Sequence, residues 1–127
     1  MKRREAREKA VQTLFQLDNT ELTADEAIAY VVERPIDPFY EKLVRGTVEH
    51  LSEIDEQLIG KLEKWSLDRL PKIERTVLRL AAFELLFGGD VPHKVVLNEA
   101  IELCKLYGDE KSGRFVNGVL SKFEEQE

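Results

Sequence analysis

The chain has 127 residues, of which 43% are hydrophobic and 35% are charged, and its formal net charge is −6. This length and balance are typical of one globular domain, residues 1–127, and exclude a disordered chain. No apolar run approaches the ~20 residues that span a bilayer, and the N-terminus lacks the pattern of a signal peptide. The single cysteine, Cys104, permits no internal disulfide, so we expect a cytoplasmic protein.

The hydrophobic pattern predicts an all-α fold, because apolar residues recur at helical spacing with almost no strand-like alternation. A capping box of Thr23 and Glu26 and an N-cap at Asp37 mark two helix starts. Trp65 and Leu67 are expected to anchor one or two short turns. In chain order, the expected helical segments are 3–17, from the capping box to about 33, roughly 38–59, the short turns within 61–70, 71–87, about 95–107 and about 109–124.

The start of the first helix is basic although the whole chain is acidic. Five basic residues fall within residues 2–9 against two acidic ones, a local charge of +3: Lys2, Arg3, Arg4, Arg7 and Lys9 against Glu5 and Glu8. Such a cluster indicates a surface for a polyanion. The alternative is a solvated first turn with no partner, and the cluster alone does not decide between them.

Phe15 lies to the same side of the first helix as some of these arginines. Guanidinium groups that hold phosphates, with a ring that stacks on a base, are the composition of a single-stranded RNA surface. The alternative, which the sequence alone slightly favours, is that Phe15 widens the buried stripe of Ala6, Ala10, Leu14 and Leu17.

The last helix has a broad apolar face and an opposite polar face. The polar face consists of Lys111, Arg114, Asn117, Gly118, Ser121 and Lys122. Basic, amide and hydroxyl side chains together can hydrogen-bond phosphates or bases. Glycine within a helix costs about 1 kcal/mol relative to alanine, so Gly118 is expected to mark close approach, more often by another helix than by a ligand.

The segment 71–87 is apolar nearly all round, which predicts a central helix. Glu84 lies on its apolar side near its C-terminus, where the helix dipole disfavours a carboxylate. It therefore needs an internal cation, a capping contact or donors from a partner protein, and an internal cation is the commonest answer. No catalytic or metal-binding arrangement is recognisable: His50 is expected to be a core histidine and Cys104 a small buried hydrophobe. We expect no enzyme, cofactor, metal or small-molecule substrate.

Short strings along nearly the whole chain resemble the NusB family of bacterial transcription antitermination factors. They are Ala6-Arg7-Glu8 with Ala10-Val11-Gln12, Trp65-Ser66-Leu67-Asp68-Arg69-Leu70, Leu78-Arg79-Leu80-Ala81 with Phe83-Glu84-Leu85, Asp90-Val91-Pro92, Asn98-Glu99-Ala100-Ile101-Glu102-Leu103 and Phe115-Val116-Asn117-Gly118-Val119-Leu120. Each string is weak alone, and their order in a chain of this length makes the resemblance specific.

The resemblance implies a fold of two packed three-helix subdomains and about seven helices. It implies binding of boxA single-stranded RNA and of NusE, a small-subunit ribosomal protein, in an RNA polymerase elongation complex with other Nus factors. By family position, Arg3, Arg4 and Arg7 would face RNA, with Phe15 near that surface. Ser121 would also face RNA, at a position that is acidic in some relatives, and Glu84 would face NusE.

Two other functions stay open. One is a helical adaptor that binds only protein, with merely solvated basic ends. The other is the RNA-binding accessory domain of an RNA methyltransferase, which shares this fold, although the sequence contains no methyl-donor loop. Salt-dependent RNA binding discriminates against the protein-only adaptor.

Overall fold

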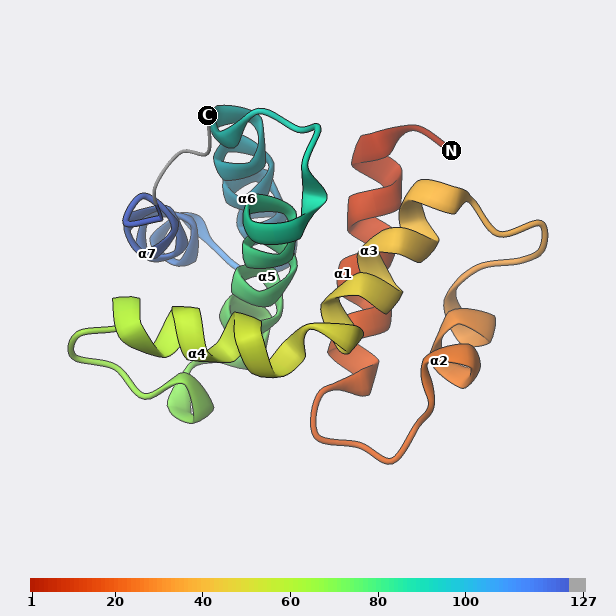
Figure 1. Cartoon of the computed structure of the whole chain (residues 1–127), viewed down its shortest axis with the longest axis horizontal. Coiled ribbons are helices and arrows are strands. Elements are labelled where there is room, and N and C mark those ends of the chain that lie inside the picture. The colour runs from red at the N-terminus through yellow and green to blue at the C-terminus, as the bar shows by residue number, and fades with distance from the viewer. Residues whose placement is uncertain (124–127) are drawn as a thin grey trace.

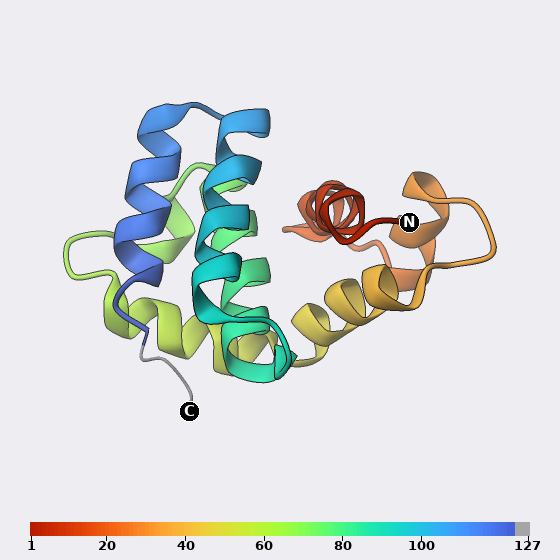
Figure 2. The ribbon, with the colours of Figure 1, turned by 90° about the horizontal axis from the view of Figure 1, so that it is seen from above.

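The computed structural model describes residues 1–123, and the helices of this part are joined by short loops (Figures 1 and 2). The helices are α1 (Arg3–Leu17), α2 (Ala24–Val31), α3 (Pro38–Glu49), α4 (Leu51–Lys61), the 3-10 turn η1 (Leu67–Arg69), α5 (Lys72–Phe83), the π-helical turn η2 (Glu84–Gly88), α6 (His93–Tyr107) and α7 (Glu110–Leu120). The all-α fold predicted from the sequence is confirmed.

Side-chain caps start two helices where the sequence predicts them. The Thr23 hydroxyl accepts a hydrogen bond from the Glu26 amide at 3.1 Å, and the Glu26 carboxylate accepts one from the Thr23 amide at 3.0 Å. The Asp37 carboxylate accepts a bond from the Tyr40 amide at 3.0 Å, with Pro38 in the first turn of α3. These bonds satisfy amides that a helix leaves free at its start.

The expected helix over 38–59 is instead two helices, because the backbone leaves the helical conformation at His50, with φ −104° and ψ 18°. The break lets α3 pack on α1 and α4 pack on α5. His50 is not the core histidine that the sequence predicts. Its side chain is 34% exposed, stacks on Phe87 with 3.9 Å between ring centroids, and places Nδ1 3.2 Å from a carboxylate oxygen of Glu53.

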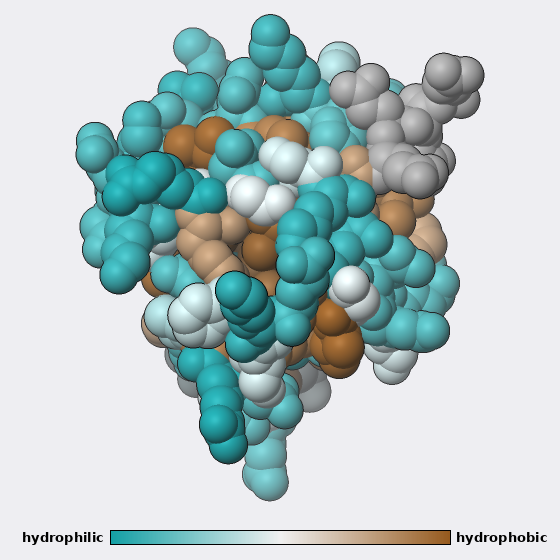
Figure 3. Space-filling view, turned by 90° about the vertical axis from the view of Figure 1, so that its left-hand side faces the viewer, coloured by the Kyte–Doolittle hydropathy of each residue, from teal (hydrophilic) through white to brown (hydrophobic). Residues whose placement is uncertain are grey.

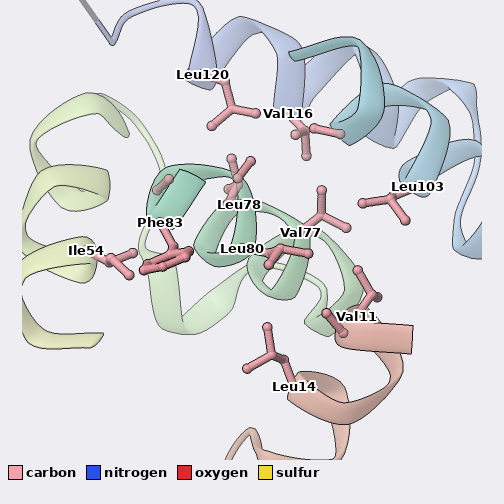
Figure 4. Packing of buried hydrophobic residues seen from close by; sticks show 14 of the residues in the cluster. Val11, Leu14, Ile54, Val77, Leu78, Leu80, Phe83, Leu103, Val116 and Leu120 are labelled. Atoms are coloured by element: carbon pink, nitrogen blue, oxygen red, sulfur yellow. The ribbon is translucent and has the colours of Figure 1, made fainter. Parts of the chain in front are cut away.

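Helices α1, α2 and α3 form one group and α4 to α7 the other (Figure 2), so the break at residue 50 adds a fourth helix to the second group. Helix α5 lies between the groups as predicted. Its buried Val77, Leu78 and Leu80 meet residues from four other helices, namely Val11, Leu14, Ile54, Leu103, Val116 and Leu120 (Figure 4). Burying one such side chain contributes about 1.5–3 kcal/mol, so this cluster dominates the stability of the fold.

A cluster of ion pairs at the end of α1 connects the two groups of helices. The Asp18 carboxylate accepts hydrogen bonds from Arg75 at 2.6 and 2.9 Å and from Arg79 at 3.2 Å. Arg79 also donates two bonds of 2.9 Å to Asp55 on α4. Since these side chains are mostly buried, the ion-pair cluster orients α1, α4 and α5 relative to one another.

Three local expectations differ from the structure. Trp65 does not anchor its segment, because it is 59% exposed, whereas Leu67 is buried as expected. The α-helical part of the central segment ends at Phe83 and continues as the π turn. Helix α7 ends at Leu120 rather than at residue 124, which lies outside the described residues. Within residues 1–123, the helices are too short or too polar to cross a membrane.

Candidate nucleic-acid interface

The first turn of α1 exposes Lys2, Arg3 and Arg4. The opposite side of the helix is the buried one, because Ala6, Ala10, Val11 and Leu14 pack into the core. Small residues at that side let the helix lie close to its neighbours, and the long basic side chains extend into solvent. The predicted basic cluster is therefore a surface feature at these three positions.

Both exposed arginines have acidic neighbours from distant parts of the chain. The Arg4 guanidinium donates hydrogen bonds of 3.1 and 3.3 Å to Glu99 on α6. This contact raises the pKa of Arg4 above its ordinary value. Arg3 lies 3.5 Å from the Asp90 carboxylate and 4.5 Å from the centre of the Phe39 ring. The basic surface is thus partly neutralised within the molecule.

Arg7 lies in a different environment from Arg3 and Arg4. It is 3% exposed and donates three hydrogen bonds, of 2.9, 3.0 and 3.2 Å, to the buried carboxylate of Glu84. The RNA contact predicted for Arg7 does not fit this position, because its guanidinium is enclosed and already paired. Glu84 likewise has the internal cation that its place on an apolar helix face requires.

The predicted polar face of α7 is present at the surface. Lys111, Arg114, Ser121 and Lys122 are exposed and Asn117 is half-buried. The spacing places these residues away from the buried Ser112, Gly113, Val116, Val119 and Leu120. The Ser121 hydroxyl donates a hydrogen bond of 2.6 Å to the Asn117 carbonyl, which leaves its lone pairs available to a ligand.

Gly118 has an open surface above it. A Cβ built at this position meets nothing within 4 Å, so the close helix approach expected there is wrong. Next to it, the Lys122 ammonium donates to the Lys61 carbonyl at 3.0 Å and lies 3.4 Å from the Glu63 carboxylate. These contacts tie the end of α7 to the end of α4.

The predicted residues fall into two groups rather than one patch. The start of α1 contacts the connection between α5 and α6 through Arg3 and Asp90, whereas the segment after α7 contacts the start of α6 through Phe123 and His93, whose Nε2 lies 3.2 Å from the Phe123 carbonyl oxygen. Figure 1 shows the start of α1 and the α5–α6 connection at the same end of the molecule. Phe15 lies in the last turn of α1 and Lys111 in the first turn of α7, at the opposite helix ends.

Phe15 forms part of a groove at the end of α1. Its side chain is 39% exposed, which differs from the core position that the sequence slightly favours. The Lys72 ammonium lies 4.3 Å from the centre of its ring. The groove has a volume of about 570 Å³ and is lined by Val11, Gln12, Phe15, Gln16, Pro71, Lys72, Ile73 and Tyr107. Aromatic rings beside an ammonium suit a base and its phosphate.

The sequence predicts no place for Lys72 and Tyr107 at this surface. The Tyr107 hydroxyl accepts a hydrogen bond of 2.8 Å from the Gln12 amide and donates one of 3.3 Å to the Glu8 carbonyl. Tyr107 ends α6 immediately before a glycine, and no spacing rule connects it with Phe15, 92 positions earlier. Only the tertiary fold, in which α1 and α6 both pack on α5, brings the two rings to one groove.

A second hollow lies beside Glu84. It has a volume of about 380 Å³ and is lined by Glu84, Leu85, Leu86, Phe87, Gly89, Asp90, Val91, Pro92 and His93. Glu84 therefore borders a surface pocket although its carboxylate is paired with Arg7. The pocket has both polar and apolar walls and includes Asp90, the partner of Arg3, so it adjoins the basic end of α1.

Within residues 1–123, no three histidine, cysteine, aspartate or glutamate side chains lie together as metal ligands. Cys104 is fully buried, as predicted, and burial with the nearby charges of Glu74 and Asp109 raises its pKa to about 12. A thiol with this pKa is almost entirely protonated at neutral pH and is a poor nucleophile.

Comparison with known proteins agrees with the fold and with the resemblance in the sequence. Residues 4–125 match the NusB family. A transcription antitermination protein NusB from Lysinibacillus sphaericus (strain C3-41) is 67% identical over 127 residues, which cover 100% of both chains. The protein of that name from Bacillus subtilis (strain 168) is 50% identical over 122 residues, 95% of this chain and 93% of the relative.

Solved structures of NusB proteins are also similar to this chain. The structure of T. maritima NusB is similar with a TM-score of 0.87 and 39% identity, covering 96% of this chain and 89% of the other. A crystal structure of the antitermination factors NusB and NusE in complex with dsRNA is similar with a TM-score of 0.83 and 38% identity, covering 94% of this chain and 92% of the other.

Proposed function

The chain belongs to the NusB family, and we propose from this premise that it acts in transcription antitermination by binding boxA RNA together with a NusE-type protein. The protein and NusE, bound to this RNA, then help to load an antitermination complex with other Nus factors onto RNA polymerase. The protein contributes no chemistry of its own. It supplies one part of a composite RNA surface, and binding of NusE to the same RNA raises the affinity of the whole assembly.

The observation that carries the RNA part is the exposed basic end of α1, Lys2, Arg3 and Arg4, in a chain of net charge −6. Beyond the start of α6, Ser121 and Lys122 follow the last residue of α7. A strand of RNA that crosses the α5–α6 connection and the start of α6 meets both groups. Arg114 and Asn117 continue this surface along α7. Phe15 and Lys111 lie at the opposite ends of α1 and α7, where they would contact a more distant part of the RNA.

The NusE part is supported by the solved complex of a similar protein and by the pocket that Glu84 borders. Since the Glu84 carboxylate is held by Arg7, its role in this proposal is to fix the wall of the pocket rather than to offer a free charge. A partner side chain that enters the pocket would contact the mostly apolar turn between Leu85 and His93.

One observation favours the alternative of an adaptor that binds only protein. Arg3 and Arg4 already have carboxylate partners in Asp90 and Glu99. Exposed ion pairs contribute only about 0–1 kcal/mol, however, so phosphates can displace them without a large cost.

The deciding experiment is a binding titration of labelled boxA RNA against a scrambled RNA of equal length, with and without NusE, at several salt concentrations. We expect boxA to bind more tightly than the scrambled RNA, NusE to strengthen binding, and affinity to fall steeply with salt. The double variant Arg3→Ala with Arg4→Ala should bind boxA more weakly. Its charge-matched control is Arg34→Ala with Arg69→Ala, because both of these residues are exposed outside the proposed surface. Equal affinity for both RNAs, in the presence of NusE, would refute the proposal.

A further inference from the structure

The loop between α4 and η1 lies on the side of the molecule away from α1, α2 and α3 (Figures 1 and 2), and it carries the single tryptophan of the chain. Trp65 lies in the loop between α4 and η1 and is 59% exposed. Its ring meets the Phe115 ring of α7 edge-on, with 5.8 Å between centroids and an interplanar angle of 82°. This contact holds the indole in place while most of its surface stays open to solvent.

Trp65 borders a groove between that loop and α7. The groove has a volume of about 280 Å³ and is lined by Lys61, Leu62, Glu63, Lys64, Trp65, Arg114, Phe115, Gly118, Val119 and Lys122. Four of these residues are basic and one is acidic, a local charge of +3 in a chain of net charge −6. Charge of this sign concentrated around an exposed ring favours a polyanionic ligand with flat groups.

The bottom of the groove is open because of Gly118. A Cβ at this position would meet nothing within 4 Å, so no packing reason accounts for a glycine that costs about 1 kcal/mol in a helix interior. Its absence of a side chain exposes the α7 backbone between Arg114 and Lys122. Figure 3 shows this side of the molecule, where hydrophobic surface is visible in the middle of the face between hydrophilic residues.

We propose that this groove binds a segment of single-stranded RNA, with one base stacked on Trp65 and the adjoining phosphates held by Lys64 and Arg114. The inference rests on the proposed function, because it extends the RNA path from the α5–α6 connection around α7. An acidic peptide would match the charge but would leave the exposed indole face without a flat partner. RNA satisfies both features, since every base has a face that stacks.

Lys122 connects this groove with the RNA surface already described. It ends the basic face of α7, contacts the Lys61 carbonyl at the groove wall, and adjoins Phe123, which meets His93 at the start of α6. A strand bound at Arg3 and Arg4 must therefore pass the end of α7 before it reaches Trp65. RNA that extends beyond the boxA segment on one side should reach Trp65 at the far wall of the groove, whereas boxA alone should end on α7, at Arg114 and Lys122.

The test uses the fluorescence of Trp65, which reports on this site alone because the chain has no other tryptophan. The full chain is titrated with boxA RNA and with boxA RNA extended by about ten uridines on the 5′ or the 3′ side, a length within the range of single-strand site sizes. Labelled RNA gives binding by anisotropy in parallel. We expect one extended RNA to quench Trp65 emission and to bind more tightly than boxA, which should bind with little quenching.

Two variants separate stacking from structure. Trp65→Leu should weaken binding of the extended RNA by about 5- to 150-fold, the range for one base stacked on an aromatic ring, and should leave boxA affinity unchanged. Trp65→Phe keeps an aromatic ring and should retain most of the affinity. Tyr30→Leu, at a 73% exposed aromatic residue on α2, is the matched control and should change neither RNA affinity. Circular dichroism checks that each variant is folded.

The inference would be overturned if the extended RNA bound the unmodified chain without changing Trp65 emission and bound folded Trp65→Leu with unchanged affinity. The proposed function would then still stand. Quenching by NusE alone and not by RNA would also overturn it, and would assign the groove to a protein. Quenching by extended RNA with no binding of boxA would support the groove and contradict the proposed function. If neither RNA binds, with or without NusE, both fall.

Discussion

The guanidinium of Arg7 encloses the carboxylate of Glu84 with three hydrogen bonds of 2.9 to 3.2 Å, and both side chains are 4% exposed. The pair joins α1 to the residue at which α5 changes into the π turn η2. It lies directly behind the pocket between η2 and α6, and Arg7 also lies 5.3 Å from the centre of the Phe39 ring. One buried ion pair thus fixes α1, α3 and η2 together.

We expect Glu84→Ala to lower the free energy of unfolding by about 3–5 kcal/mol, because it leaves the buried Arg7 charge without a partner. Urea denaturation measures the change. Glu102→Ala removes an exposed carboxylate from α6 and, as the control, should change stability by less than about 0.5 kcal/mol. The double variant Arg7→Met with Glu84→Leu should recover much of the loss, since replacing both charges by apolar groups removes the unpaired ion. A loss below about 1 kcal/mol in Glu84→Ala would contradict this account of the pair.

The features predicted correctly from the sequence are those with local causes. The capping box at Thr23, the N-cap at Asp37 and the apolar character of α5 each depend on neighbours within one or two helical turns. Burial of Cys104 follows from the same spacing. Local signals therefore sufficed for the fold class, most helix starts and much of the core.

The features that the sequence did not predict depend on distant residues. Arg3 and Arg7 are one turn apart on α1, and only Glu84, 77 positions after Arg7, decides that Arg7 is buried. The break at His50 carries no proline or glycine, and it accompanies a difference in packing, since α3 lies on both α1 and α5 whereas α4 lies on α5. The groove at Phe15 likewise needs Tyr107 from α6. Tertiary contacts of this kind leave no spacing pattern in the chain.

Gly46 provides a test of the packing between α3 and α5. A Cβ at this position would overlap the ring of Phe83, which is buried, so we expect Gly46→Ala to destabilise the protein by about 1–3 kcal/mol. Gly60→Ala in α4 is the matched control, because a Cβ there meets nothing within 4 Å. That substitution should be neutral or stabilise by up to about 1 kcal/mol. Equal melting temperatures for the two variants would show that the ring moves aside without cost.

Substitution of Arg3 and Arg4 together by alanine should weaken RNA binding and reduce its salt dependence. Each phosphate contact to a single strand contributes about −0.7 to the slope of log K against log salt, so the slope should become shallower by about 1.4. Helix content should hardly change, since arginine and alanine both favour helices. Arg7→Ala, by contrast, should act on stability and not on the slope. A folded double variant with the original slope would remove these two residues from the interface.

Glu99→Gln should increase RNA affinity, because the Glu99 carboxylate competes with phosphate for the Arg4 guanidinium. The Arg4 side chain is 63% exposed, and an exposed pair is worth only about 0.2–1 kcal/mol, so the increase should be about 1.5- to 5-fold. Arg4 keeps its charge in both proteins, because a guanidinium is protonated at neutral pH with or without a carboxylate partner, so the substitution changes only which group Arg4 binds. Titration in the Arg4→Ala background is the control. An increase that persists there would show that Glu99 acts through the general field and not through Arg4.

Phe15→Leu separates stacking on RNA from packing in the core. Leucine retains apolar contact with the groove but offers no flat face, so RNA affinity should fall by about 1–3 kcal/mol if a base stacks on Phe15. Because the Phe15 side chain is 39% exposed, the melting temperature should change little. Leu14→Ala, one residue earlier and only 7% exposed, is the contrasting control and should lose about 2–5 kcal/mol of stability while its folded fraction still binds RNA. A fall in melting temperature with unchanged RNA affinity in Phe15→Leu would assign this ring to the core, and the groove beside Lys72 would then have no part in binding RNA.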